Sequence, residues 1–222
     1  MTSTIRLVFS SITPPATKTF VQSGGQPTFV VANGSSSVDL NILGTFRRTS
    51  TNAMTISASA VAQCASGGTY EHGFDGGAVP PITWNSGSTF EVTGITNENS
   101  FSSGGIQSFH HVVWNCPSQT SIFSFGGLTT INGNFTVQST GASPSASSML
   151  LLTNSSTLTT TVSGNLSITG GYFAPFGGNT SGNCILNVSG NLSLASGTFD
   201  IFRQASNSGT INLSGDFSMT SG

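Results

Sequence analysis

The chain has 222 residues, of which 5 are Lys or Arg and 7 are Asp or Glu, and its formal net charge is −2. Charged residues make up 5% of the sequence, whereas about 25% is usual in a globular domain. Non-specific binding to nucleic acid is excluded, because it requires several Lys or Arg side chains to neutralise phosphates. No apolar stretch reaches the ~20 residues that span a bilayer, so no membrane span is predicted.

Residues 1–125 form the less regular part of the chain and carry all 3 His and both of the 2 Trp residues. We find no linker composition, and we therefore expect one continuous elongated domain. Its irregular part covers residues 1–125, and regular repeats cover residues 126–222. Because the chain stops directly after the strand-like Phe217–Met219, we expect it to be a segment of a longer protein.

A polar and aromatic group of residues in the first part is the candidate glycan-binding site. Glu71, His72 and Asp75 lie close together in the sequence, and carboxylates with an imidazole can bind a metal or transfer protons. Trp84 and Trp114 offer flat faces for a sugar if they are exposed. The alternative interpretation is structural, with a polar loop at a coil corner and Trp side chains in the core. The sequence favours this alternative, so no catalytic residue, cofactor or metal ion is predicted.

The remaining histidines and the cysteines do not form a metal-binding motif. His110 and His111 are adjacent, and on a strand they would point to opposite faces. Cys64, Cys116 and Cys184 are widely spaced, without a C-x-x-C pair. We predict that the cysteines are small buried apolar side chains, with one disulfide as the alternative.

One short pattern recurs four times in the second half of the chain. The copies are Ile131–Val137, Val162–Ile168, Val188–Leu194 and Leu213–Met219, and each contains a Gly followed by Asn or Asp: Gly133-Asn134, Gly164-Asn165, Gly190-Asn191 and Gly215-Asp216. Apolar residues alternate with Ser, Thr or Asn, which predicts half-buried strands. We expect the Gly-Asn pair to make a bend or bulge, because Gly readily adopts positive φ and Asn tolerates it.

These features predict an all-β protein, a parallel β-helix (β-solenoid) with coils of roughly 25 residues. A single coil cannot bury its own apolar face, whereas stacked coils share one core at a spacing of ~4.8 Å. Stacked like charges would repel along a column, while Asn, Ser and Thr can hydrogen-bond there. This difference explains why so few residues of the sequence are charged. A β-sandwich is the competing architecture.

Two stretches, residues 70–96 and 114–135, carry a family resemblance, most specifically in Trp114–Thr120 (Trp-Asn-Cys-Pro-Ser-Gln-Thr). Over residues 66–222 the sequence resembles large secreted repeat proteins of Bacteroidetes, which are type IX secretion substrates with β-helical stalks. The resemblance implies export through the secretion machinery to the cell surface or the medium. It also implies an adhesin-like or structural role and no catalytic residues.

The sequence therefore predicts a non-enzymatic structural or adhesive segment of a large secreted, cell-surface repeat protein. Expected partners are surface glycans, other cell-surface proteins and the neighbouring repeats of the same chain. One alternative is a carbohydrate-binding or polysaccharide-cleaving β-helix. A second alternative is the subunit of a self-assembling surface filament.

Overall fold

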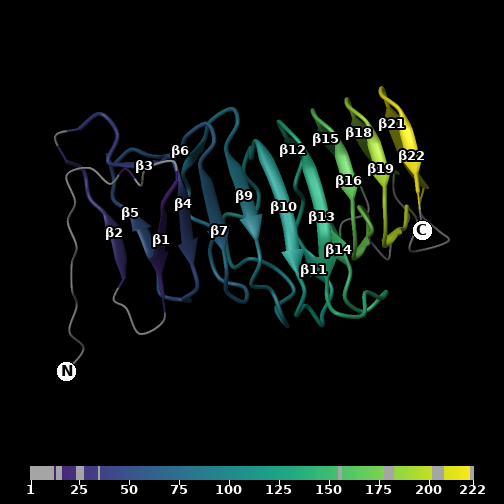
Figure 1. The fold of residues 1–222 in the computed structure, drawn as a ribbon, viewed down its shortest axis with the longest axis horizontal. Helices are drawn as coiled ribbons and strands as arrows, with labels where there is room; N and C mark the ends of the chain where they lie inside the picture. Colours follow the sequence, from purple (N-terminus) through teal and green to yellow (C-terminus); the bar gives the residue numbers. More distant parts are fainter. Residues whose placement is uncertain are drawn as a thin grey trace.

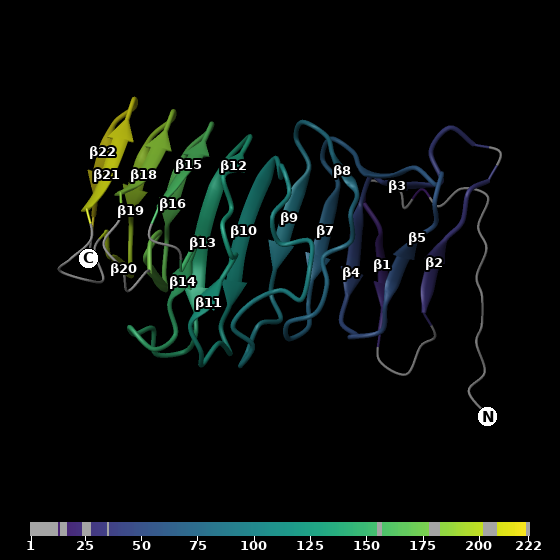
Figure 2. The same cartoon turned by 180° about the vertical axis from the view of Figure 1, so that it is seen from behind.

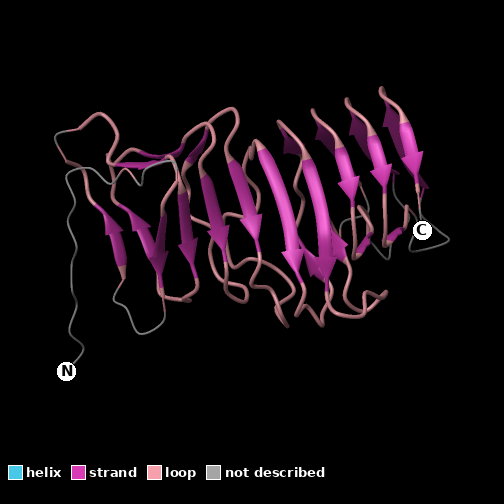
Figure 3. Cartoon of the chain, in the orientation of Figure 1, coloured by secondary structure: helices cyan, strands magenta, loops and turns pink. Residues whose placement is uncertain are grey.

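In the computed structural model, the strands of the protein stack along one long axis, from β1 (Thr19–Gln22) toward β22 (Phe217–Met219) (Figure 1). The structure describes residues 13, 17–23, 28–34, 36–154, 157–177, 183–201 and 208–220. Every regular element in these ranges is a β-strand (Figure 3). The all-β prediction is confirmed.

One nine-stranded parallel sheet runs the length of the stack. Its strands, in spatial order, are β1, β4 (Thr45–Arg48), β7 (Thr69–His72), β9 (Thr89–Val92), β10 (His111–Cys116), β13 (Phe135–Thr140), β16 (Leu166–Ile168), β19 (Leu192–Leu194) and β22. Spatial order equals sequence order, and each strand pairs in parallel with the next, 20 to 31 residues further on. This arrangement confirms the predicted parallel β-helix.

Shorter parallel sheets form the other faces of the stack, seen from behind in Figure 2. In the second half these are β11 (Phe123–Ser124), β14 (Leu150–Leu151), β17 (Tyr172–Phe173) and β20 (Thr198–Phe199), and separately β12 (Thr130–Ile131), β15 (Leu158–Val162), β18 (Asn183–Val188) and β21 (Ser208–Leu213). In the first half β2 (Phe29–Val31) pairs with β5 (Met54–Ile56), and β3 (Leu40–Ile42), β6 (Ala62–Cys64) and β8 (Thr83–Trp84) form a three-stranded sheet. The nine-stranded sheet crosses residue 125 without a break.

Aromatic rings stack directly above one another in the core of the first half. Phe46, Tyr70 and Phe90 are in register on consecutive strands, and all three are fully buried. The ring centroids of Phe46 and Tyr70 lie 6.2 Å apart, and those of Tyr70 and Phe90 lie 6.1 Å apart, in stacked orientations. In the second half Leu166 and Leu192 continue the same column. The sheet register thus stacks apolar side chains on one another in adjacent layers.

The four repeat glycines form one column, as a stacked architecture requires. The N–H of Gly164 donates to the carbonyl of Gly133 at 2.9 Å, and the N–H of Gly190 donates to that of Gly164 at 2.9 Å. Gly215 donates in the same way to Gly190 at 3.2 Å. These bonds link successive turns outside the strands themselves.

The residues after the glycines form a second, parallel column through their side chains. Asn134 Oδ1 accepts from the N–H of Asn165 at 2.9 Å, and Asn165 Oδ1 accepts from the N–H of Asn191 at 2.8 Å. The N–H of Asp216 donates to Asn191 Oδ1 at 2.9 Å. Each amide side chain therefore completes the backbone hydrogen bonding of the turn above it.

The expected reason for the repeat glycines is wrong, because none of the four has a positive φ. Glycine is required there for lack of space. A Cβ added at Gly190 would overlap Asn165 Oδ1 and lie 2.7 Å from the carbonyl oxygen of Gly164, and Gly164 and Gly215 have the same surroundings one turn below and above. The Asn side chain of one turn occupies the volume of the missing side chain on the next.

The three cysteines are buried thiols, in agreement with the predicted role as small apolar side chains. Cys64 and Cys116 are fully shielded from solvent. Burial raises the pKa of each of these two thiols to about 12, so they stay protonated at neutral pH. Neither is a nucleophile in the folded protein.

Candidate functional site

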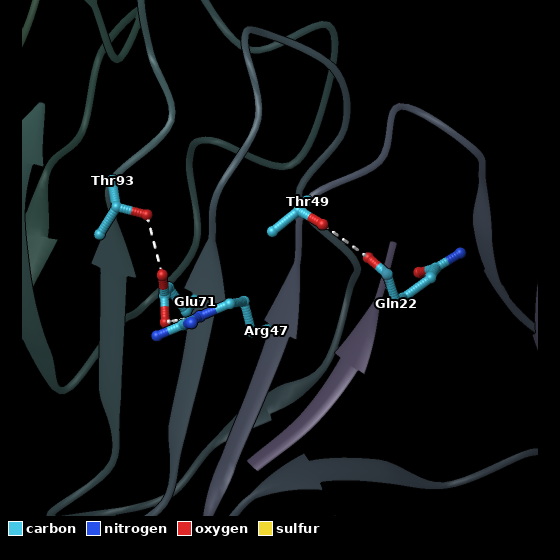
Figure 4. A network of polar contacts seen from close by, with 5 residues as sticks. All are labelled: Gln22, Arg47, Thr49, Glu71 and Thr93. Atoms are coloured by element: carbon cyan, nitrogen blue, oxygen red, sulfur yellow. Dashed lines mark hydrogen bonds and ion pairs between the residues drawn. The ribbon is translucent and has the colours of Figure 1, made fainter. Parts of the chain in front are cut away.

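Glu71 is the candidate residue with the most extensive polar contacts. It lies on β7, on the face of the nine-stranded sheet opposite the aromatic column, and is paired in register with Arg47 on one side and Glu91 on the other. Arg47 Nε lies 2.6 Å from Glu71 Oε2, and the hydroxyl of Thr93 donates to Glu71 Oε1 at 3.0 Å (Figure 4). Only 7% of Glu71 is exposed. Both of its oxygens are therefore already engaged within the protein.

Glu91 lies beside Glu71 on the neighbouring strand, so two like charges are stacked, and the pKa of Glu91 shows the effect. Partial burial raises the pKa of its carboxyl group, and the neighbouring Glu71 carboxylate raises it further. Arg47, two strands away, opposes the shift. Two carboxylates in one column are thus unfavourable even beside a cation, which is the physical reason for expecting neutral columns elsewhere.

His72 does not form part of an accessible site with Glu71, and its burial agrees with the structural interpretation that the sequence favoured. The two residues are adjacent on β7, so their side chains lie on opposite faces. His72 is fully buried, its Nε2 lies 2.6 Å from the carbonyl oxygen of Gly76, and its ring packs against Phe74 at 4.0 Å. Burial lowers the pKa of His72 to about 4, so the ring is neutral at physiological pH.

Asp75 organises a loop. Its carboxylate accepts hydrogen bonds from the backbone N–H groups of Thr96, Asn97 and Glu98 and from the Thr96 hydroxyl, at 2.6 to 3.2 Å. Partial burial alone would raise its pKa, but these hydrogen bonds outweigh burial and hold the pKa below the ordinary value for Asp. Asp75 thus joins the corner after β7 to the corner after β9, and its lone pairs are used for that purpose.

The two tryptophans differ in accessibility. Trp114 is fully buried, in agreement with the structural alternative that places the Trp side chains in the core. Its Nε1 donates to Gln119 Oε1 at 2.9 Å, and Gln119 Nε2 donates in turn to the carbonyls of Ser148 and Met149 on the next turn. The motif at 114–120 is therefore a corner that joins two turns.

Trp84 is only partly buried. It packs edge-on against Phe109, with ring centroids 4.9 Å apart, and its Nε1 donates to Gln107 Oε1 at 3.1 Å. It lies on β8, in a different sheet from Glu71. Trp84 is thus a half-buried residue that packs against the core and does not lie beside the carboxylates.

Arg48 is a buried polar centre that the sequence analysis missed. Only 2% of it is exposed, and its guanidinium donates to Gln22 Oε1, the Tyr70 hydroxyl and the carbonyls of Asn52 and Ala78, at 2.6 to 3.1 Å. It also lies over the ring of Phe74, 4.8 Å from the centroid. Arg48 follows the apolar Phe46 by two positions, and side chains two positions apart on a strand lie on the same face. This spacing was the sequence signal that could have placed Arg48 on the inner face.

Neighbouring contacts extend this polar region to the first strand. The hydroxyl of Thr49 donates to the backbone carbonyl of Gln22 at 3.4 Å (Figure 4). The N–H of Thr49 donates to the same carbonyl at 2.9 Å. β1 is therefore attached to the second turn by side-chain as well as backbone contacts.

His110 and His111 begin the column that the repeat glycines and asparagines continue. The N–H of Gly133 donates to the carbonyl of His110 at 2.7 Å, and the N–H of Asn134 donates to His111 Nδ1 at 3.0 Å. Among the described residues, no group of three or more His, Cys, Asp or Glu side chains is placed to hold a metal ion. The imidazole of His111 takes the place that an Asn oxygen has in later turns.

No protein-family model matches the chain, and neither the curated proteins nor the solved structures contain a match. Within the described ranges, no helix has the length and apolar character needed to cross a membrane.

Proposed function

We propose that this chain is a non-enzymatic structural or adhesive segment of a large secreted, cell-surface repeat protein. The observation that carries the proposal is the parallel sheet of nine strands, in which each strand pairs with the next one in sequence order. Backbone hydrogen bonds and Asn side chains join successive turns of the second half. Such a stack is suited to act as a spacer or as a long, neutral binding surface.

The chemistry of the columns supports a spacer that is insensitive to ionic strength. Salt screens interactions between exposed charges over about 8 to 10 Å, and the described residues contain one ion pair, Arg47–Glu71. Nine strands give eight inter-strand spacings, or about 38 Å at ~4.8 Å each. The length of the segment is thus set by backbone geometry.

The export part of the proposal is supported by the sequence resemblance to secreted β-helical proteins of Bacteroidetes. The residues that carry the resemblance most specifically include Trp114 and Gln119, which form the buried corner between two turns. Surface glycans, other cell-surface proteins and further repeats of the same long chain are the proposed partners. The secretion machinery is the proposed partner during export.

Spin labels at Ser23 and Thr220 test the spacer function by pulsed electron resonance. Both residues are exposed and flank the first and last strands of the large sheet. A spacer gives a narrow distance distribution near ~40 Å that is the same in 0.05 M and 1 M NaCl. A flexible chain of this length would give a broad distribution with an r.m.s. value near ~80 Å, and that result would refute the proposal.

A carbohydrate-binding or carbohydrate-cleaving β-helix is the second candidate, favoured by the in-register pair Glu71 and Glu91. Two neighbouring carboxyl groups, one with a raised pKa, are the groups that glycoside hydrolysis uses. A glycan array and a reducing-sugar assay on the wild type, Glu71→Gln and Glu91→Gln separate the candidates, with Glu98→Gln as the control. Sugar release that is lost in the first two variants and kept in the control would establish the enzyme and overturn the spacer proposal.

A further inference from the structure

Two imidazole rings lie together where the irregular part of the stack meets the column of repeat glycines and asparagines. His111 begins β10, and His110 precedes it in a bend. Their ring centroids are 4.3 Å apart, and the ring planes make an angle of 84°. The rule that adjacent strand residues point to opposite faces does not separate the two rings, because His110 lies outside the strand.

The Nδ1 atoms of both rings border the same small volume beside Gly133. A Cβ added at Gly133 would lie 2.6 Å from His110 Nδ1 and 2.6 Å from His111 Nδ1. The volume is left to the imidazoles because residue 133 has no side chain. The glycine at the first copy of the repeat thus allows two titratable nitrogens to approach each other.

These two Nδ1 atoms differ in their hydrogen bonds. His111 Nδ1 accepts from the backbone N–H of Asn134 at 3.0 Å, so the neutral ring carries its proton on Nε2. His110 Nδ1 is buried and has no hydrogen-bond partner among the described residues. His110 Nε2 lies 3.2 Å from Ser86 Oγ. The tautomer that donates from Nε2 to Ser86 leaves a lone pair on His110 Nδ1, next to the His111 ring.

We propose that His110 and His111 form a proton switch at this joint. One proton taken from solvent binds His111 Nδ1, which then stops accepting from Asn134 and donates to the lone pair of His110 Nδ1. The N–H of Asn134 is released in the same step. The switch exchanges one hydrogen bond for another with the uptake of one proton, and it gives the buried nitrogen of His110 a partner.

The charges around the pair limit it to a single proton. On β9, Thr89 lies opposite His111, and Glu91, two positions further along the same face, is the carboxyl group that faces the pair from this side. On the other side, residues 132–136 carry no titratable side chain. Burial lowers the pKa of His111 from its ordinary value of 6.5, and a charge on His110 lowers it further. Two protons on neighbouring rings would repel, so the pair takes up one, below pH 6.5.

The exchange is local to the first member of the asparagine column. The N–H of Gly133 donates to the carbonyl of His110 at 2.7 Å, and the N–H of Val112 donates to the carbonyl of Asn134 at 2.9 Å. Neither bond involves an imidazole, so both remain when the pair is protonated and the turns stay stacked. The switch goes beyond the proposed spacer function, because a spacer needs no titratable group here. The distance measurement reports on the spacer alone, so the two proposals fail separately.

Amide NMR of the isotope-labelled chain over a pH series from 8 down to 4.5 tests the switch. The Asn134 amide resonance should titrate with one midpoint below pH 6.5. Its exchange with solvent, corrected for the intrinsic effect of pH, should become about two- to tenfold faster, as loss of one hydrogen bond predicts. The Asn165 amide, which donates to Asn134 Oδ1, is the reference in the same spectra and should not titrate.

Two variants separate the switch from other effects of pH, and circular dichroism verifies that both fold. His111→Asn supplies the acceptor of the later turns without a titratable group, so the Asn134 amide should no longer titrate. His110→Phe keeps a ring but removes the nitrogen that receives the proton, so the midpoint should fall by at least about half a pH unit. If His110 acted only as a neighbouring positive charge, the same variant would raise the midpoint.

Nitrogen shifts of the imidazole rings test the proton positions in the wild type itself. At pH 8 the proposal requires His111 Nδ1 to be unprotonated and His110 to carry its proton on Nε2. A proton on His110 Nδ1 at pH 8 would overturn it, because that nitrogen could not then accept. An Asn134 amide that ignores pH in the wild type, that still titrates in His111→Asn, or whose midpoint does not fall in His110→Phe would overturn it equally.

Discussion

The side-chain oxygen of Asn165 accepts a hydrogen bond of 2.8 Å from the backbone N–H of Asn191, one turn further along the stack. The two residues are 26 positions apart in sequence, yet they form a contact of the kind that usually caps a local turn. The bond gives the Asn191 N–H an acceptor at the bend just before β19. Because the same bond recurs on neighbouring turns, the column is a unit of stability that mutation can measure.

Replacing Asn165 by Ala should lower the free energy of unfolding by about 0.5–1.5 kcal/mol, the usual net worth of one hydrogen bond. Asn165→Asp should keep most of the stability, because a carboxylate oxygen accepts the same bond. Urea unfolding followed by circular dichroism measures the difference. Ser163→Ala, at an exposed position on the same turn, is the control and should change stability by less than about 0.5 kcal/mol. Equal stabilities of the Ala and Asp variants would contradict the role of the acceptor.

Gly190→Ala should destabilise the protein by about 1–3 kcal/mol, the usual cost of overpacking. The added Cβ would overlap Asn165 Oδ1 and lie 2.7 Å from the carbonyl of Gly164. In the double variant with Asn165→Ala, the first overlap is removed, so the combined loss should be smaller than the two single losses added together. A double-mutant cycle in urea measures this coupling. Strictly additive losses would mean that the Asn165 side chain does not occupy the space that a side chain at position 190 would need.

The second half of the fold was predictable because its turns repeat in sequence. The spacing of Gly133, Gly164, Gly190 and Gly215 directly indicates the stacking. The column of Phe46, Tyr70 and Phe90 was not predictable in this way, because no Gly-Asn pair marks its turns. The reason why glycine is required at the repeat positions was not predictable either, because it depends on the side-chain oxygen of an Asn about 25 positions earlier in the sequence.

The candidate site was less predictable than the fold for the same reason. Proximity in sequence grouped Glu71 with His72, whereas strand alternation puts them on opposite faces. Register between turns determines their real neighbours, Glu91 for the first and the buried aromatic rings for the second. The sequence did not reveal Arg48 as a polar centre, because its uncharged partners come from four separate segments of the chain.

Arg48→Met should destabilise the protein by at least about 3 kcal/mol. The buried oxygen atoms of Gln22 and Tyr70 would lose the donor that Arg48 supplies, and each unsatisfied buried group costs about 1–3 kcal/mol. Arg48→Lys keeps the charge but lacks the planar fork that reaches several acceptors at once. It should recover only part of the loss. Thermal and urea unfolding of the three proteins test this order, and full recovery with Lys would show that the charge alone is required.

Cys64 and Cys116 should resist alkylation in the folded protein. Burial raises the pKa of both thiols to about 12, so less than about one molecule in a thousand carries the reactive thiolate at pH 8, and solvent does not reach it. A short iodoacetamide pulse at pH 8 followed by peptide mass mapping should leave both unmodified. The same pulse in 6 M guanidinium should label all three cysteines of the sequence. Rapid labelling of either residue under native conditions would contradict the packing of the core.

His72 should make the protein less stable as the pH falls. Burial, assisted by the Arg48 charge and opposed by the hydrogen bond to Gly76, lowers the pKa of His72 from 6.5 to about 4. Between these two values the unfolded chain binds a proton that the folded protein excludes, so the contribution of His72 to stability is complete above pH 6.5. It is lost progressively as the pH falls toward 4, by about 3 kcal/mol in total.

Replacing His72 by Phe removes the titration while keeping an aromatic ring among Phe74 and Phe101, its neighbours at 4.0 and 5.0 Å. Urea unfolding of both proteins at intervals between pH 4 and pH 8 gives the difference in free energy of unfolding. We expect that difference to move in favour of the Phe variant by about 3 kcal/mol on going from pH 7 to pH 4. Subtraction cancels the carboxyl groups that titrate in both proteins, including Glu91 and Asp75. A difference that does not change with pH would mean that the imidazole is protonated as easily in the folded core as in water.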